Sequence, residues 1–387
     1  MATLALYVHV PFCAKHCAYC DFNTYTEKAQ SALVVETVEA ISEDIVQTAQ
    51  VLDSEQRVRP VQSVFFGGGT PTFLSGAQLT RLLNTLREQF NVSQGAEITS
   101  EANPTSSDSE KFEQMRSAGF NRLSIGVQAF DDTILKALDR FHTAGEAQAA
   151  FLQARAAGFE NISLDLMFGL PKQTRTLLEA TLDCALALEP EHISLYALTL
   201  EPGTRFERLY AGGKLELPDE DDEIRMYERS IERLTAEGYE HYEVSNFARA
   251  GRRSRHNQTY WQNEEYLGFG PGAVSYLKGR RWKRERLPKR YAEKVRMGAD
   301  LSVESECLER DGTLGETFML GLRMREGMLL SRIRERFGVE PRTHFGEVFA
   351  DLKAKGWLEE EGDTIRLTHQ GLLLANEALQ AFLPNEG

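Results

Sequence analysis

Cysteines and long apolar segments are scarce in this 387-residue sequence, and both shortages exclude classes of protein. Five cysteines are too few for a small secreted scaffold held together by disulfides. The two that stand alone, Cys184 and Cys307, are expected to be small buried side chains. No run approaches the ~18 apolar residues that cross a bilayer, and Met1 to Thr3 lack the basic start of a signal peptide. We therefore expect a cytoplasmic protein that is not transmembrane.

Basic residues are also in deficit. The sequence has 44 Lys and Arg against 58 Asp and Glu, which gives a net charge of −14. That balance argues against non-specific binding to nucleic acid or to anionic membranes. The apolar content of 42% and the charged content of 26% are typical of a soluble globular protein. Because the chain is too long for one ordinary core, we expect one large domain and a smaller one.

The remaining three cysteines are concentrated within eight residues. Cys13, Cys17 and Cys20 form the pattern C-x3-C-x2-C directly after the first apolar run, and no fourth cysteine lies nearby. Three thiolates on one tight loop suit a 4Fe-4S cluster that leaves one iron open. The amino and carboxylate groups of S-adenosylmethionine (SAM) can chelate such an iron. A zinc site completed by His9 or His16 is the alternative.

Apolar strands and amphipathic helices alternate through the first 200 residues. The expected strands are 4–10, 61–66, 98–101, 122–127, 162–167 and 192–198. The expected helices are 31–51, 75–90, 111–117, 144–156 and 177–188. Such alternation indicates an α/β fold with a parallel sheet, and the spacing fits a partial (β/α)6-type barrel. Gly119, Gly158 and Gly238 are expected to end helices in the left-handed conformation.

The pattern changes twice after the barrel domain, which is expected to cover residues 1–240. Residues 241–310 are predicted to be an irregular, basic connecting region. Residues 311–387 are predicted to form a smaller domain. Its helices, a hairpin at 356–367 and a last helix at 371–382 resemble a winged helix.

Polar residues at the ends of several expected strands would converge on the mouth of the barrel. The loop 67–72 reads Gly-Gly-Gly-Thr-Pro-Thr and lacks the Lys-Ser/Thr ending of a phosphate loop. Glu101 and Gln128 lie at two strand ends, and Asp165 lies within a core strand, where a carboxylate needs a partner or a ligand. Arg140 can meet a carboxylate through two hydrogen bonds. Together these residues indicate a site for a zwitterionic nucleoside.

The cysteine motif resembles the signature of the radical SAM superfamily, and the chain as a whole resembles its oxygen-independent coproporphyrinogen III oxidase family. The resemblance is carried by the segments 7–13, 67–72, 101–104, 124–128 and 165–171. It implies a 4Fe-4S cluster on Cys13, Cys17 and Cys20. It also implies SAM contacts at Tyr7, Tyr19, Gly68, Gly69, Thr70, Glu101, Gln128, Arg140, Asp165 and Ala197.

Two features depart from the oxidases of this family. Phe22 stands where the oxidases have a fourth cysteine, and only twelve residues precede Cys13, where the oxidases have a long extension. The segment 256–261, His-Asn-Gln-Thr-Tyr-Trp, is similar to the marker of the haem chaperone branch. The resemblance therefore implies a chaperone that binds haem and transfers it to acceptor haemoproteins, respiratory and membrane-associated ones among them.

The chemistry of this segment suits haem. Histidine is a common axial ligand of haem iron, so His256 is a candidate ligand, and Tyr260 and Trp261 can stack on the macrocycle. Three nearby arginines can meet the propionates: Arg252, Arg253 and Arg255. A lone histidine is more often an ordinary hydrogen-bonding residue, and that alternative stays open.

Two further functions also stay open. One is the oxidase itself, which decarboxylates porphyrinogen propionates by radical chemistry. The other is a radical SAM enzyme that modifies nucleic acid, suggested by the winged-helix-like tail and the basic run 280–284. The net charge opposes the second of these, since such a run is more often a solvated face. The sequence leaves open whether SAM is cleaved, and therefore whether the protein is an enzyme.

Overall fold

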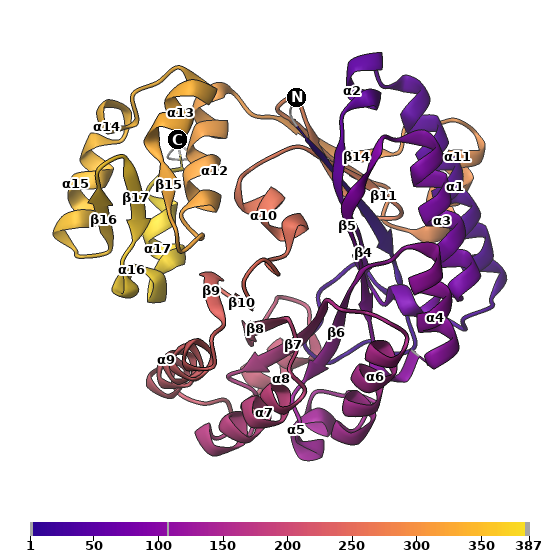
Figure 1. Ribbon diagram of the computed structural model, residues 1–387, viewed down its shortest axis with the longest axis horizontal. Helices are drawn as coiled ribbons and strands as arrows, with labels where there is room; N and C mark the ends of the chain where they lie inside the picture. Colours follow the sequence, from indigo (N-terminus) through magenta and orange to yellow (C-terminus); the bar gives the residue numbers. More distant parts are fainter. Residues whose placement is uncertain (1–2, 107, 384–387) are drawn as a thin grey trace.

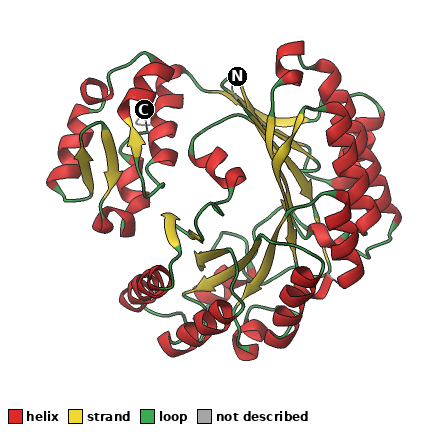
Figure 2. Cartoon of the chain, viewed as in Figure 1, coloured by secondary structure: helices red, strands yellow, loops and turns green. Residues whose placement is uncertain are grey.

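The computed structural model describes residues 3–106 and 108–383, and a mixed sheet is its main feature (Figures 1 and 2). The strand order of the sheet is β14-β13-β12-β11-β1-β4-β5-β6-β7-β8-β10-β9. Its central strands run parallel: β1 (Leu4–Val10), β4 (Val61–Gly68), β5 (Val92–Ala102), β6 (Arg122–Gln128), β7 (Ile162–Phe168) and β8 (His192–Ala197). These are the six strands that the sequence predicts, so the α/β partial barrel is confirmed.

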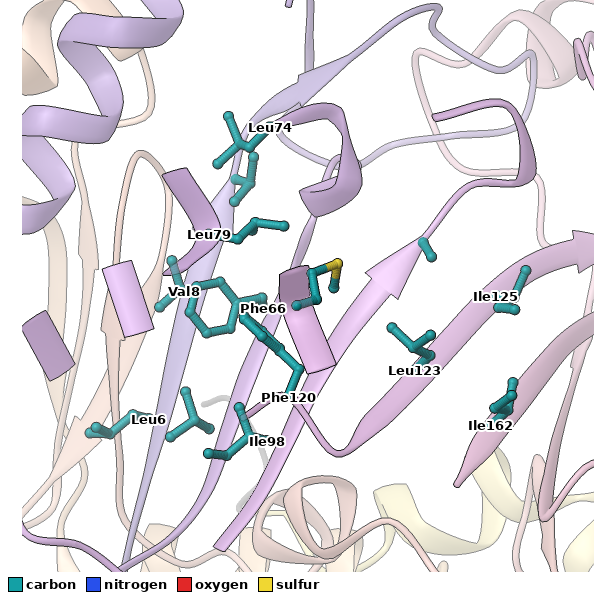
Figure 3. Close-up of a cluster of buried hydrophobic side chains, with 14 of the residues drawn as sticks. Leu6, Val8, Phe66, Leu74, Leu79, Ile98, Phe120, Leu123, Ile125 and Ile162 are labelled. Carbon is teal, nitrogen blue, oxygen red and sulfur yellow. The ribbon is translucent and has the colours of Figure 1, made fainter. Parts of the chain in front are cut away.

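Helices cover the outer face of the curved sheet (Figure 1). They include α1 (Ala32–Val51), α3 (Gly76–Gln89), α4 (Ser109–Ala118), α6 (Ala144–Ala156), α7 (Arg175–Ala187) and α9 (Glu220–Ala236). Buried side chains such as Val8, Phe66 and Leu123 fill the space between the sheet and the helices (Figure 3). The predicted glycine ends are confirmed at Gly119, Gly158 and Gly238, whose φ angles are 103°, 89° and 81°.

The segment predicted to be irregular, residues 241–310, instead extends the sheet at both edges. At one edge, β10 (Asn246–Ala248) pairs antiparallel with β8, and β9 (Glu240–Glu243) follows it. At the other edge, β11 (Tyr266–Phe269) pairs parallel with β1 and leads to β12 (Val274–Leu277), β13 (Arg280–Arg284) and β14 (Ser302–Cys307). These strands are short and partly exposed, so no clear apolar period marks them in the sequence.

The basic run 280–284 is the strand β13, and acidic partners neutralise most of it. Arg281 forms ion pairs with Glu306 and Glu316, each at 2.7 Å. Lys283 lies 3.6 Å from Glu304. Because these cations are paired within the protein, the run is no free surface for nucleic acid.

A buried ion pair attaches β13 to the helical layer. Arg284 donates to both carboxylate oxygens of Asp44 on α1, at 2.7 and 2.9 Å, and also to Thr48. Tyr291 on α11 (Pro288–Arg296) donates to the same carboxylate at 2.7 Å. Both charged side chains are at most 4% exposed. The network therefore joins three elements that lie far apart in the sequence.

The C-terminal residues form a second core around a three-stranded sheet. The helices are α12 (Arg310–Gly321), α13 (Leu330–Phe337), α14 (Pro341–His344), α15 (Gly346–Ala354), α16 (His369–Leu373) and α17 (Ala375–Gln380). The strands are β15 (Met328–Leu329), β16 (Leu358–Glu361) and β17 (Thr364–Leu367). Phe318, Phe349 and Phe382 lie at the centre of this core. The predicted last helix, 371–382, is wrong in one respect, because the chain breaks near Leu374 into two short helices.

Two expectations about the surface have different outcomes. Cys184 and Cys307 are exposed and not buried, because one lies on the outer side of α7 and the other ends the edge strand β14. Among the helices in the described ranges, none has the length and apolarity needed to cross a membrane.

Candidate functional site

A cavity of about 610 Å³ opens on the inner face of the sheet. Its volume lies within the range of small-molecule sites in proteins. The cavity is lined by the three cysteines, Cys13, Cys17 and Cys20, and by all ten residues expected to contact SAM: Tyr7, Tyr19, Gly68, Gly69, Thr70, Glu101, Gln128, Arg140, Asp165 and Ala197. The barrel therefore brings together residues that are spread over 190 positions of the sequence.

The three thiols lie on the loop that follows β1 and are half-buried and free. The Sγ atom of Cys13 lies 3.4 Å from the hydroxyl of Thr70, and Arg140 donates to the Sγ atom of Cys17 at 3.6 Å. Burial raises the pKa of Cys13, and it raises the pKa of Cys20 to about 11. Metal binding removes thiol protons, so a bound cluster would overcome these shifts. Three thiols beside a guanidinium fit an anionic cluster.

The zinc alternative finds no support in the two histidines it needs. Both ring nitrogens of His9 are engaged, one with the hydroxyl of Tyr7 and the other with the carbonyl of Asn23, each at 3.0 Å. The ring of His16 contacts the carbonyl of Cys17 at 3.1 Å. Within residues 3–106 and 108–383, no three His, Cys, Asp or Glu side chains are arranged to hold a single metal ion.

The glycine loop is packed tightly against the end of β1 and the residues just before the cysteines. A Cβ atom at Gly68, whose φ is +106°, would lie 2.4 Å from the ring of His9. A Cβ atom at Gly69 would lie 2.7 Å from the carbonyl of Phe12. The N–H groups of Gly68 and Gly69 already donate, to Glu101 at 3.2 Å and to the carbonyl of Val10 at 2.8 Å. A ligand amino group, which is a donor, would therefore use the carbonyl oxygens of this loop.

Two acids share the cavity. Asp165 accepts hydrogen bonds from the hydroxyls of Ser124, at 2.9 Å, and Ser163, at 3.1 Å. Burial, and then the charge of Asp165, raises the pKa of Glu101 to about 8. Burial also raises the pKa of Asp165. Two acceptors in a partly water-excluded cavity suit a ligand that carries positive charge and hydroxyl groups.

Arg140 has an unused donor. One Nη atom donates to the carbonyl of Gly126 at 2.6 Å and the other to Cys17. Its buried Nε atom has no hydrogen-bond partner among the described residues. Arg140 therefore does not meet a carboxylate of the protein. The carboxylate of SAM would satisfy the remaining donor.

The segment expected to bind haem forms the helix α10 (Arg255–Trp261), which lies within the hollow of the curved sheet (Figure 1). His256 is 1% exposed and borders the cavity together with Tyr260. The Nδ1 atom of His256 lies 2.9 Å from the Ser63 hydroxyl, and Nε2 lies 3.0 Å from the Tyr260 hydroxyl. Burial, and then the charge of Arg122, lowers the pKa of His256 to about 3. The imidazole is therefore neutral, which iron ligation requires, but both of its nitrogens are engaged.

Other haem contacts expected from the sequence are not brought to this cavity. Trp261 packs against Tyr242 and Met324 and so does not line the cavity with His256 and Tyr260. The neighbouring arginines are also engaged elsewhere: Arg253 pairs with Glu240 and Glu326, and Arg255 donates to the carbonyl of Gly95. Stacking by Trp261 and propionate binding by these two arginines do not follow from this arrangement.

Several residues that line the cavity were not assigned to it from the sequence. Phe22 and Phe141 border the cavity and are each 62% exposed. Arg122 and Ser124 lie on the same face of β6 as Gly126, which also lines the cavity. The register of β6 shifts between Gly126 and Gln128, so a two-residue spacing counted from the predicted Gln128 does not lead to this pair. Phe22 follows Cys20 by two residues and Phe141 follows Arg140 directly, and this proximity was their signal in the sequence.

Comparison with known proteins gives the family of the chain. Residues 7–185 match the radical SAM superfamily, and residues 308–374 match the HemN C-terminal domain. The solved structure of coproporphyrinogen III oxidase (HemN) from Escherichia coli, a radical SAM enzyme, superposes with a TM-score of 0.85 at 27% identity. The match covers 98% of this chain and 90% of that one. The fold and the site thus define a radical SAM protein, and membership of this superfamily implies a 4Fe-4S cluster and SAM.

Relatives along the full chain narrow the assignment. A protein named heme chaperone HemW from Bacillus subtilis (strain 168) is 40% identical over 97% of this chain and 98% of its own length. Its namesake from Escherichia coli (strain K12) is 35% identical over 98% of each chain. The chain belongs to the HemW family.

The raised pKa of Glu101 predicts a pH-dependent stability for the cluster-free protein. The folded carboxyl keeps its proton up to pH about 8, whereas the unfolded one releases it near its usual 4.5. The contribution of Glu101 to the free energy of unfolding should therefore fall as the pH rises through this window and level off above it. Glu101→Gln should remove this contribution. Melting temperatures of both proteins at pH 5, 6, 7 and 8 test it, and a constant difference between them would contradict the raised pKa.

Proposed function

We propose that this protein is a cytoplasmic haem chaperone that binds haem and transfers it to acceptor haemoproteins, with respiratory and membrane-associated proteins among the acceptors. The observation that carries the proposal is the segment 256–261, because its His256 and Tyr260 border the same cavity as the three cysteines. Support also comes from relatives named heme chaperone HemW, at 35–40% identity over nearly the whole chain.

The same proposal assigns the cofactor residues. Cys13, Cys17 and Cys20 hold the 4Fe-4S cluster, which supplies an open iron to the amino and carboxylate groups of SAM. Arg140 meets that carboxylate, and its hydrogen bond to Cys17 supports this assignment. The two acids of the cavity, Glu101 and Asp165, meet the positive charge and the ribose hydroxyls. The other SAM contacts are as expected from the sequence: Tyr7, Tyr19, Gly68, Gly69, Thr70, Gln128 and Ala197.

Haem binding through His256 needs one local rearrangement. The Tyr260 hydroxyl occupies Nε2 of the imidazole, while Nδ1 is held by Ser63. Iron can reach Nε2 only after the tyrosine hydroxyl withdraws. The loss of one hydrogen bond costs about 0.5–1.5 kcal/mol, which haem ligation can offset. Tyr260 therefore lowers the affinity of His256 for iron while it keeps the ring oriented.

Haem titration of two variants tests this role. His256→Ala should shift the Soret band and weaken haem binding without changing the cluster spectrum. Tyr260→Phe frees Nε2 and should strengthen haem binding by about two- to tenfold, the equivalent of one hydrogen bond. His369→Ala is a suitable control, because His369 is exposed on the C-terminal domain. An unaltered Soret spectrum in His256→Ala would show that another residue ligates the iron.

The oxidase is the second candidate, favoured by the TM-score of 0.85 with HemN. Phe22 argues against it, since it stands where the oxidases of the family have a cysteine. Conversion of coproporphyrinogen III to protoporphyrinogen by the reconstituted protein, with SAM and a reductant, would contradict the chaperone proposal. The nucleic-acid alternative loses its main support, because acidic partners neutralise the run 280–284.

A further inference from the structure

The cavity is bordered by a buried guanidinium that forms no ion pair with any residue that the structure describes. Arg122 is the first residue of β6, is 2% exposed, and borders the cavity. Its Nε atom has no hydrogen-bond partner, and no ion pair to its guanidinium is found in residues 3–106 and 108–383. A guanidinium stays charged in proteins, and a buried charge without a partner is costly.

Arg284 shows what a buried arginine requires in the same protein. It is 3% exposed, and Asp44 meets it with two hydrogen bonds at 2.7 and 2.9 Å. Arg122 is equally buried, and none of the described carboxylates meets it in this way. Its unused donors border the cavity, where a ligand can supply the missing anion.

No acidic side chain in residues 3–106 and 108–383 forms an ion pair with Arg122. Asp165 is near enough for the charge of Arg122 to lower its pKa, but its oxygens accept hydrogen bonds from Ser124 and Ser163. The two nearby imidazoles, His192 and His256, are neutral, because burial and then the charge of Arg122 lower their pKa values. The positive charge of Arg122 is therefore left for a ligand.

If Arg140 holds the carboxylate of SAM, that carboxylate would lie at the cluster end of the cavity and not at Arg122. Arg140, assigned to that carboxylate, donates to the carbonyl of Gly126 and to Cys17 at the cluster end. Arg122 precedes Gly126 by four residues of the same strand, which is roughly 13 Å along it. SAM has one carboxylate, and the open iron and Arg140 hold it. Arg122 therefore serves a second ligand.

Aromatic rings form the wall beside this cation. Phe65 stacks on His256 with ring centroids 5.1 Å apart, and the ring of Tyr7 lies 6.3 Å from each of them. Tyr260 stands edge-on to His256 at 5.0 Å. A carboxylate attached to a flat, apolar scaffold matches a guanidinium next to such a wall.

We propose that Arg122 binds a propionate carboxylate of haem at the floor of the cavity. The inference rests on the proposed haem-binding function. It makes Arg122 the propionate partner in place of the arginines near α10. It places the propionate next to His256, on the side of the cavity opposite the cluster. We commit to a propionate of haem as the carboxylate at Arg122. A free carboxylic acid in the same place is the alternative that the experiments below distinguish.

The affinities for haem and for its dimethyl ester, which lacks both carboxylates, test the contact between Arg122 and a propionate. Wild-type protein should bind haem between about tenfold and a hundredfold more tightly than the ester, as expected for a charge-assisted hydrogen bond. Arg122→Gln should lose most of this preference for haem, and any remainder would come from the second propionate. Arg122→Lys should lie in between, because it keeps the charge but not the two-pronged geometry. Equal haem affinity in Arg122→Gln and wild type would overturn the proposal, as would equal losses for haem and ester.

A stability measurement separates this role from a structural one. Because no side chain in the described ranges forms an ion pair with Arg122, Arg122→Gln should melt no lower than the wild type, with cluster content unchanged. If Arg122→Gln does not fold, the wild-type comparison of haem with its ester and the Arg122→Lys titration still decide the matter.

Sodium propionate, with neutral propionamide as its control, tests the subsite without haem. Stabilisation of the wild type by propionate, absent in Arg122→Gln, would support a carboxylate site even if the wild type bound no haem; the haem-chaperone proposal alone would then fail. If Arg122 gives a preference for haem over its ester but free propionate does not stabilise the wild type, the subsite is specific for the carboxylate of the macrocycle, which supports the proposal. Neither effect in the wild type would overturn it.

Discussion

Cys17→Ser protein, reconstituted anaerobically with iron and sulfide, should hold no stable 4Fe-4S cluster. The reason is that C-x3-C-x2-C provides only three thiolates, so losing one leaves two irons without a protein ligand. Cys17 is also the thiol to which Arg140 donates, and its loss removes that contact beside the assigned SAM carboxylate. We expect near-complete loss of the iron EPR and Mössbauer signals and of SAM binding.

The fold should survive this substitution. Cys17 is half-buried, forms no disulfide, and lies on a loop at the cavity and not in the core. Far-UV circular dichroism of Cys17→Ser should therefore match the wild type. Cys184→Ser is the matched control, since Cys184 is an exposed free thiol on α7 and should leave the cluster intact. About one zinc and no iron per wild-type chain would contradict the cluster assignment.

Replacement of Arg284 by methionine should lower the free energy of unfolding by about 3–5 kcal/mol. The change leaves the Asp44 carboxylate buried with only the Tyr291 and Thr48 hydroxyls as partners. It also detaches β13 from α1, so the strands added at this edge of the sheet lose their main polar link to the helices. Urea denaturation followed by circular dichroism measures the loss.

Two further variants make this test specific. Arg229→Met removes an exposed ion pair with Glu179 and should cause no measurable change, because solvent screens such pairs. Asp44→Asn combined with Arg284→Met should recover part of the loss, since the unpaired charge is then absent. A negligible effect of Arg284→Met alone would mean that the buried pair does not stabilise the fold.

The two buried arginines thus have opposite expected effects. Loss of Arg284 leaves the Asp44 carboxylate without its ion pair and destabilises the protein, whereas loss of Arg122 breaks no ion pair among the described residues and weakens ligand binding. Burial alone does not distinguish these cases, because both residues are almost fully buried. The presence or absence of a protein partner does.

Local patterns determined much of the fold and the site. Each of the six central strands and the helices between them carries its own apolar period and end signals, such as Ser75 at the start of α3 and Gly119 at the end of α4. The cysteine motif and the glycine loop are also continuous in sequence. Every residue that these motifs assign to the cluster or to SAM lines one cavity, because parallel strands present their ends at one edge of the sheet.

Only the tertiary structure showed which strands form after residue 240 and which side chains there reach the cavity. The added strands are short and gain their stability from pairing with distant β1 and β8, which no local period records. Within α10, His256 and Tyr260 are four residues apart and share a face, while Trp261 is turned about 100° away, toward Tyr242. Whether Arg122 has a partner depends on groups from several strands at once. Pairing across the sheet and the presence of a countercharge are properties of three-dimensional neighbours, so a linear sequence cannot state them.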